Sequence, residues 1–194
     1  MVWSTPRNAE NHANGILRKM GSHKFTIIAT GLDPNADDFG DRFFEAGCDD
    51  ATLSFQKGAL IVEFDRDART FSSALLSAIA NVREAGAKVV HVEPDHLVSL
   101  SDIALRAGIT RAAASNYAKG SRSQGFPSPV ARVTTSTPLW DWVDVARWLH
   151  ASGRLSKHEI LRARLVRRAN QGLAQNNVTP GRQKTEHEAR PPQR

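Results

Sequence analysis

The sequence predicts a mixed α+β protein of two folded units followed by a basic helix. Residues 24–95 alternate between strand-like and helix-like apolar patterns, whereas residues 96–155 hold three shorter helical patterns around a Thr/Ser-rich turn. The 194 residues allow two small domains, each near the lower size limit for an independent core. The charge also divides near residue 95, with ten Lys or Arg against fourteen Asp or Glu before it and sixteen against six after it.

Four segments of the first unit have the composition of β-strands. They are rich in β-branched and aromatic residues and are bounded by turn-forming residues. These segments are KFTIIATG (24–31), ATLSF (51–55), ALIVEF (59–64) and KVVHVE (88–93). The middle two flank Gln56-Lys57-Gly58, which predicts a hairpin loop with Gly58 where a positive φ is required.

Two helices are predicted between these strands. The first carries Phe39, Phe43 and Ala46 on one face and ends before Gly47. The second is capped by Thr70 and ends at Gly86, and its apolar face consists of Phe71, Leu75, Ile79 and Val82. The order strand, helix, strand, strand, helix, strand is that of a ferredoxin-like βαββαβ domain, with two helices on one face of an antiparallel sheet. We expect residues 24–95 to serve in dimerisation or in binding a partner protein or a small ligand.

Acidic residues around the first helix allow two interpretations. Four carboxylates would suit a hard metal ion, but they lie in or before the first turns of a helix, where negative charge is favoured by the helix dipole. They are Asp33, Asp37, Asp38 and Asp41. We therefore expect no metal site, and we expect the pairs Asp49/Asp50 and Asp65/Asp67 to be solvated loop charges. The single cysteine, Cys48, is predicted to be a small packed residue rather than a nucleophile.

The two ends of the chain are polar. Residues 1–23 are predicted to be a disordered lead-in and residues 171–194 a disordered tail. A basic helix is expected over residues 156–170, opened by the capping-box sequence Ser156-Lys157-His158-Glu159. Its arginines either contact phosphates, support pairing with a second copy, or form a solvated surface; they are Arg162, Arg164, Arg167 and Arg168. One cysteine and the lack of a signal-like or membrane-spanning apolar run indicate a cytoplasmic protein without membrane contact.

Residues 101–119 have the pattern of two crossed helices. Ala104 is small enough for a helix crossing, and Gly108 tolerates the positive φ that the intervening turn requires. Ile109, Ala114 and Tyr117 are the expected apolar anchors, and Thr110 is the expected cap of the second helix. The remaining outward positions carry short polar and basic groups that are able to reach base edges or phosphates in a major groove.

The sequence that follows predicts a short β-hairpin and a third helix. Residues 129–133 and 139–140 are the expected strands, and Thr134–Thr137 is the expected tip. The helix that follows has one apolar face made of Trp142, Val145, Ala146 and Leu149. Trp140, Trp142 and Trp148 could stack on single-stranded bases, but their spacing favours a role in the core of a small domain.

With these pieces in order, residues 97–149 resemble the excisionase-type winged helix of the MerR superfamily. The resemblance is carried by LSDIALRAGITRAAASNY, by the FPSPV turn and by LWDWVDVARWL, and it covers under a third of the chain. It implies binding of double-stranded DNA, with the second helix in the major groove and the wing on the backbone or the minor groove. The DNA-binding residues that it implies are Thr110, Arg111, Ser115, Asn116, Lys119, Arg122, Arg132, Thr135 and Ser136.

We therefore expect a sequence-specific DNA-binding protein, as in transcriptional regulation, that is not an enzyme and uses no cofactor or metal. A single winged helix makes few base contacts, so a homodimer on two half-sites is expected. Two alternatives stay open. One is an antitoxin-type interaction protein that regulates its own operon, and the other is an excisionase-like recombination accessory factor.

Overall fold

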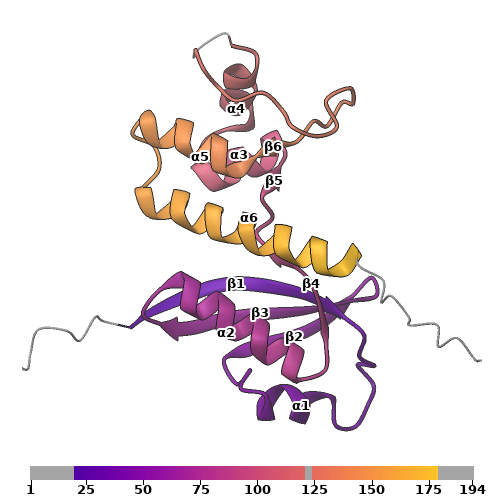
Figure 1. The fold of residues 1–194 in the computed structure, drawn as a ribbon. Coiled ribbons are helices and arrows are strands. Elements are labelled where there is room, and N and C mark those ends of the chain that lie inside the picture. The colour runs from indigo at the N-terminus through magenta and orange to yellow at the C-terminus, as the bar shows by residue number, and fades with distance from the viewer. Residues whose placement is uncertain (1–19, 121–123, 179–194) are drawn as a thin grey trace, which may run out of the picture.

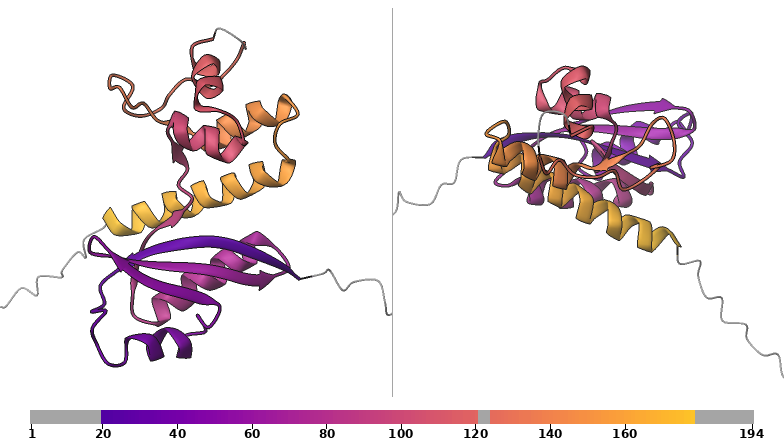
Figure 2. Two further views of the ribbon diagram at one scale, coloured as in Figure 1. Left: turned by 180° about the vertical axis from the view of Figure 1, so that it is seen from behind. Right: turned by 90° about the horizontal axis from the view of Figure 1, so that it is seen from above.

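The computed structural model describes residues 20–120 and 124–178 as a mixed α+β chain in two units, with one long helix between them (Figures 1 and 2). The elements of the first unit are β1 (Gly21–Thr30), α1 (Phe39–Glu45), β2 (Ala51–Gln56), β3 (Ala59–Ala68), α2 (Phe71–Glu84) and β4 (Lys88–Glu93). Their order along the chain is the predicted one.

The first unit is built on a four-stranded antiparallel sheet in the order β2-β3-β1-β4. Alternate residues of the two central strands are buried on one face of this sheet, where α2 packs against β1, β3 and β4. On β1 these residues are Phe25, Ile27 and Ala29, and the register places Ile27 opposite Val62 and Val92. The strict alternation along β1 explains why the sequence pattern identified this strand.

The hairpin between β2 and β3 has a two-residue loop, because Gln56 pairs with Ala59. Lys57 has a φ of 52° and Gly58 a φ of 78°. Two successive positive φ values are typical of a type I′ turn, whose twist matches that of the strands it joins. The prediction of a positive φ at Gly58 is confirmed, and Lys57 adopts one as well.

The helix ends follow the predicted capping residues. The Thr70 side chain accepts a hydrogen bond from the backbone N–H of Ser73 at 3.1 Å, at the start of α2. Gly47 after α1 and Gly86 after α2 have φ values of 79° and 92°. At the start of α1, Asp38 accepts a hydrogen bond from Arg42 at 2.7 Å, one turn further along.

Arg66 of β3 is a buried charge, and only 7% of its surface is exposed. Its guanidinium donates two hydrogen bonds of 2.7 Å to the two carboxylate oxygens of Asp50, in bidentate geometry. Further hydrogen bonds reach the Gly47 carbonyl oxygen, Ser77 and Asn81, so this side chain joins β3 to α2 and to the start of β2. The expectation that Asp50 is a solvated loop charge is therefore wrong. Its partner lies sixteen residues away on a strand position that alternation reserves for the core.

The second unit contains β5 (Leu97–Val98), α3 (Leu100–Ala107), α4 (Arg111–Ala118), β6 (Trp140–Asp141) and α5 (Trp142–Ala151). Trp140 and Trp142 are buried in its core, and Trp148 is partly buried against it. This is the packing role that their spacing predicted.

Helix α6 (Lys157–Val178) lies between the two units in Figure 1 and in the view from behind in Figure 2. Its first turns contribute Ile160 and Ala163 to the core of the second unit. Its later turns contribute Val166 and Leu173 to the core of the first unit. One helix thus completes both cores.

Three predicted boundaries are corrected by these elements. β3 continues to Ala68 rather than ending at residue 64, so Asp65 and Asp67 lie on a strand and are not the loop charges that were expected. β1 begins at Gly21 rather than at residue 24, because Gly21, Ser22 and His23 continue its pairing with β3. The expected basic helix over 156–170 continues to Val178, so residues 171–178 do not belong to a disordered tail. Residues 171–178 are mostly polar, but Leu173 among them is buried and packs on the first unit. It follows Val166, which packs on the same core, by two helical turns. Residues 1–19 of the predicted lead-in and 179–194 of the predicted tail lie outside the described residues.

Candidate nucleic-acid interface

The helices α3 and α4 form the crossed pair that the sequence predicted. The Ser99 side chain caps α3 by accepting a hydrogen bond from the backbone N–H of Asp102 at 3.3 Å. Gly108 ends α3 in the left-handed conformation, with a φ of 62°. The Ile109 N–H donates to the Ala104 carbonyl oxygen at 2.9 Å, which closes the turn before α4 starts. A residue with a side chain would be strained at Gly108, so this turn fixes the angle between the helices.

The inner side of the pair is apolar. Ile103, Ala104 and Ala114 are buried in the core of the second unit, and Ile109 packs against it. Tyr117 lies 5.0 Å from Trp148, measured between ring centroids, and Phe126 lies 5.1 Å from the same tryptophan. This aromatic cluster holds the last turn of α4 against α5, so the helix has a defined orientation.

The outer side of α4 presents polar residues to the surface. Arg111 and Lys119 are exposed at its two ends, and Ser115 and Asn116 are half-buried between them. Arg111 donates a hydrogen bond to Ser101 of α3 at 3.1 Å. The Thr110 hydroxyl accepts from the backbone N–H of Ala113 at 3.1 Å, so its oxygen is engaged in capping. Of the predicted residues of this helix, Thr110, Arg111 and Lys119 are therefore exposed and Ser115 and Asn116 partly so, while Arg122 lies outside the described residues.

The predicted wing is only partly formed. Ala131 and Leu139 make one isolated bridge, and β6 pairs instead with β5, directly before α3. The expectation of two strands at 129–133 and 139–140 that pair with each other is thus corrected. Pro129 and Pro138 lack the N–H that a longer ladder would need. The loop between the bridge residues exposes Arg132, Thr135 and Ser136, and Arg132 has a φ of 50°.

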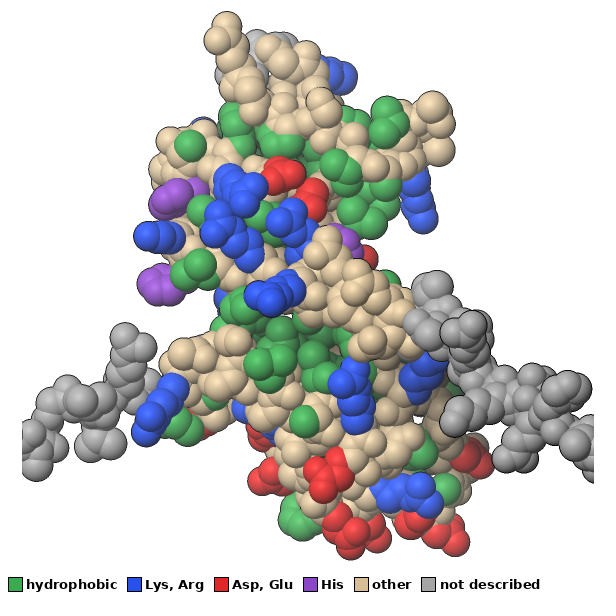
Figure 3. Space-filling model, in the orientation of Figure 1, with side chains coloured by type: hydrophobic (Ala, Val, Ile, Leu, Met, Phe, Trp, Pro, Cys, Tyr) green, Lys and Arg blue, Asp and Glu red, His purple; other side chains and the backbone are tan. Residues whose placement is uncertain are grey.

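Positive charge in the second unit is concentrated on α5, α6 and the turn between them rather than on α4. Figure 3 shows Lys and Arg side chains gathered over α5 and α6, and Asp and Glu side chains gathered around α1. We call the group of Lys and Arg side chains over α5 and α6 the α5–α6 basic surface. Its exposed members are Arg147, Arg154, Lys157, Arg164 and Arg168. The acidic and basic halves of the sequence thus correspond to two different surfaces.

The four arginines predicted on the basic helix divide into two pairs. Arg162 donates to the Lys24 carbonyl oxygen at 2.7 Å, and Arg167 donates to Asp141 at 3.0 Å. Arg164 and Arg168 are exposed. The first two therefore have structural roles, because they hold α6 against β1 and against the start of α5.

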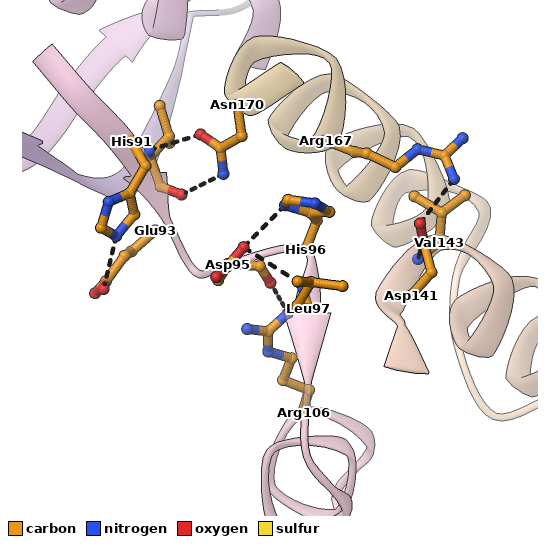
Figure 4. A network of polar contacts seen from close by, with 11 residues as sticks. His91, Glu93, Asp95, His96, Leu97, Arg106, Asp141, Val143, Arg167 and Asn170 are labelled. Atoms are coloured by element: carbon orange, nitrogen blue, oxygen red, sulfur yellow. Dashed lines mark hydrogen bonds and ion pairs between the residues drawn. The ribbon is translucent and has the colours of Figure 1, made fainter. Parts of the chain in front are cut away.

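The junction between the units is a polar network, shown in Figure 4. The Arg106 side chain of α3 donates to the backbone oxygen of Asp95 at 2.8 Å. The backbone N–H of Trp142 donates to the backbone oxygen of His96 at 2.7 Å. Burial raises the pKa of Asp95, but His96 and the backbone N–H of Leu97 outweigh this effect, and the pKa falls below its ordinary value. These contacts tie the segment between β4 and β5 to α3 and to the start of α5.

Sequence reasoning missed Arg106 and Arg162 as members of this junction. Arg106 follows the buried Ile103 by three positions, which places a charge beside the apolar face of α3. Arg162 lies between Ile160 and Ala163, both of which are buried. In each case, an arginine next to apolar positions of a helix was the sequence signal that could have predicted a contact at the junction.

None of the described helices is both long and apolar enough to cross a membrane. Within residues 20–120 and 124–178, no three His, Cys, Asp or Glu side chains are grouped so as to hold a metal ion. Comparison of the chain with protein-family models, curated proteins and solved structures finds no match.

Proposed function

We propose that this protein binds double-stranded DNA sequence-specifically, as a transcriptional regulator, with α4 in the major groove. The observation that carries the proposal is that Arg111 and Lys119 are exposed, and Ser115 and Asn116 partly exposed, on a helix whose Ala114 is buried in the core of its unit. Side chains of this kind make hydrogen bonds to base edges and phosphates. The tight turn at Gly108 and the aromatic cluster at Tyr117 support the rigidity that base recognition requires.

The same proposal gives each unit a class. The second unit is of the winged helix-turn-helix kind, with a short wing at Thr134–Thr137 that brings Arg132, Thr135 and Ser136 near the DNA backbone. The first unit is of the ferredoxin-like kind, which its antiparallel order β2-β3-β1-β4 supports. In this arrangement the first unit serves in dimerisation, so that two copies of α4 read two half-sites.

The α5–α6 basic surface adds a second contact to this picture. Exposed guanidinium groups such as those of Arg164 and Arg168 attract phosphates at long range without selecting a sequence. We assign them to nonspecific affinity, and α4 to specificity. Salt dependence distinguishes nonspecific affinity from specificity. Each phosphate contact adds about 0.9 to the magnitude of the slope of log affinity against log salt concentration, whereas contacts to base edges do not.

The test begins with selection of a preferred duplex from a random pool, using the full chain. Affinity for that duplex and for a scrambled one is then measured by fluorescence anisotropy over a range of salt concentrations. Arg111→Ala should weaken binding to the selected duplex by about 1–3 kcal/mol and reduce the preference over the scrambled duplex. Arg164→Ala should weaken both duplexes alike and reduce the salt slope. Lys88→Ala, which removes an exposed charge from the first unit, is the matched control.

A second variant guards against loss of folding. Ala112 is exposed in the first turn of α4, where a carboxylate favours the helix dipole. Ala112→Glu should therefore leave thermal stability intact while repelling phosphates and abolishing specific binding. Unchanged affinity of both Arg111→Ala and Ala112→Glu for the selected duplex would refute the proposal.

A further inference from the structure

A cavity of about 240 Å³ lies at the junction of the two units. Its walls come from α2, from the segment between β4 and β5, and from α3, α5 and α6. The volume is below the 300–1,000 Å³ that drug-sized ligands occupy, so it suits a small metabolite. Because residues of both units line it, its contents would contact the sheet unit and the helix pair together.

Two guanidinium groups face this cavity, and each is held against an aromatic ring. The Arg106 guanidinium carbon lies 5.2 Å from the ring centroid of Trp142, and that of Arg162 lies 4.5 Å from the ring of Phe71. Each group donates one hydrogen bond to a backbone oxygen, that of Asp95 for Arg106 and that of Lys24 for Arg162. A guanidinium has five N–H donors, so most of its capacity is left for another acceptor.

Neither arginine has a carboxylate partner within 4.0 Å in the described part of the chain. Arg42, Arg66, Arg147 and Arg167 all have one. Burial lowers the pKa of Arg106, as expected for a cation that is poorly solvated. Two partly buried positive charges at one cavity are costly unless an anion offsets them.

The acidic groups near the cavity offset these charges only in part: burial lowers the pKa of Arg106 more than the carboxylates of Asp102, Asp95 and Glu93 raise it. Asp95 accepts a hydrogen bond from the Leu97 N–H at 3.3 Å and lies 2.8 Å from the Nδ1 atom of His96. That buried nitrogen makes no well-aligned hydrogen bond within the described residues. Glu159 lines the cavity one turn before Arg162 but forms no ion pair with it within 4.0 Å.

We infer that this cavity binds a small organic anion whose carboxylate or phosphate group lies between Arg106 and Arg162, with its apolar part against Phe71, Trp142 and Val166. Arginine binds such groups through paired N–H donors, and the aromatic rings keep both guanidinium planes in place. Val166 and Ala163 supply an apolar wall from α6. The chemistry selects organic anions over inorganic ones and over neutral molecules of the same shape.

Occupation of the cavity would also act on the helix pair, since Arg106 lies in the last turn of α3, directly before the turn to α4. This consequence rests on the proposed DNA binding, whereas ligand binding itself does not. The two are tested separately by measuring ligand binding without DNA first.

The experiment titrates the full chain with benzoate and with phenyl phosphate by calorimetry and by NMR of the tryptophan indole N–H signals. At least one of the two should bind, and it should shift the Trp142 signal. The indoles of Trp140 and Trp148 donate to the oxygens of Pro127 and Gln124 and should move little, so they report on location. Benzyl alcohol and inorganic phosphate are the neutral and inorganic controls, and neither should bind comparably.

Three variants assign the binding to named residues. Arg106→Gln and Arg162→Gln should each weaken binding by about tenfold or more, as for the loss of hydrogen bonds to a charged group. Glu159→Gln should tighten binding, because it removes a negative charge from the cavity; a defect in folding would not produce this opposite sign. Lys88→Gln, which removes an exposed charge from the first unit, should bind as the natural chain does.

Failure of both organic anions to bind at millimolar concentration would overturn the inference. So would equal binding of inorganic phosphate, or binding that shifts Trp140 and Trp148 but not Trp142. If an anion binds as expected and the selected duplex does not bind at all, the ligand site stands and the proposed function falls. If both bind, affinity for the duplex should change when the anion is present, and an unchanged affinity would refute the coupling.

Discussion

Asn170 of α6 completes the hydrogen bonds of Val92 on the edge strand β4. The Val92 N–H donates to the side-chain oxygen of Asn170 at 2.7 Å, and the Asn170 amide donates to the Val92 carbonyl oxygen at 3.0 Å (Figure 4). The two residues are 78 positions apart. Because β4 is the last strand in the sheet order, one side chain of a helix does here what a neighbouring strand would do. This pair fixes α6 against the first unit.

Replacement of Asn170 by alanine should destabilise the protein strongly. It leaves a buried N–H and a buried carbonyl without partners, each worth about 1–3 kcal/mol, so a loss of about 2–6 kcal/mol is expected. Urea unfolding measures the loss. Asn176→Ala, on an exposed position of the same helix, should change stability by less than about 0.5 kcal/mol. Equal effects of the two substitutions would show that the Val92 contact is unimportant.

Replacement of Arg66 should have a comparable effect within the first unit. Arg66→Ala leaves Asp50 without its bidentate partner, and breaking a buried ion pair costs about 3–5 kcal/mol. The exposed neighbour Arg69 provides the control substitution, Arg69→Ala. Chemical denaturation of both variants measures the difference. Asp50→Asn combined with Arg66→Ala should lose less than the sum of the two single losses, and strict additivity would argue against direct coupling.

Cys48 should be unreactive in the folded protein. It is buried, and this burial raises the pKa of its thiol to about 11, so little thiolate forms at neutral pH. A thiol reagent should label it slowly without denaturant and rapidly in urea. Because the thiol ionises more readily in the unfolded chain, folding stability should fall by about 2–3 kcal/mol as the pH rises from 9 to 11. Cys48→Ala should have a shallower loss of stability over that range; identical pH profiles would contradict the assignment.

Two glycine substitutions should have opposite signs. Gly108 has a φ of 62°, so Gly108→Ala should cost about 1–2 kcal/mol although no atom blocks the new Cβ. Gly172 lies inside α6 with open space around its Cβ position, so Gly172→Ala should stabilise the protein by about 0.5–1 kcal/mol. Thermal unfolding of the two variants measures both effects. Destabilisation of equal size in both would mean that the turn conformation at Gly108 carries no special cost.

The order of elements in the first unit follows from local information. Strict alternation in β1, glycines at the helix ends and the capping residue Thr70 each act within a few residues, and all were readable in the sequence. The pairing of Arg66 with Asp50 and of Asn170 with Val92 depends on contacts between segments that only the folded chain brings together. Asn170 did leave a signal, because it occupies a buried helical position between Val166 and Leu173.

The candidate interface divides in the same way. The crossed helices and the turn at Gly108 are local, so the positions of Arg111 and Lys119 were predictable. The wing was not, because the prolines at 129 and 138 weaken its pairing and Trp140 pairs with Val98 instead. The cavity at the junction of the units is formed by residues from five segments, and no local sequence pattern marks such a place.

The most direct test of the account is an NMR titration of the full chain with the selected duplex, followed at each backbone amide. The largest shifts should lie between Thr110 and Lys119, with smaller ones at Arg132–Ser136. Shifts confined to the α5–α6 basic surface or to the first unit, with α4 unaffected, would contradict the claim that the polar side of α4 lies against DNA.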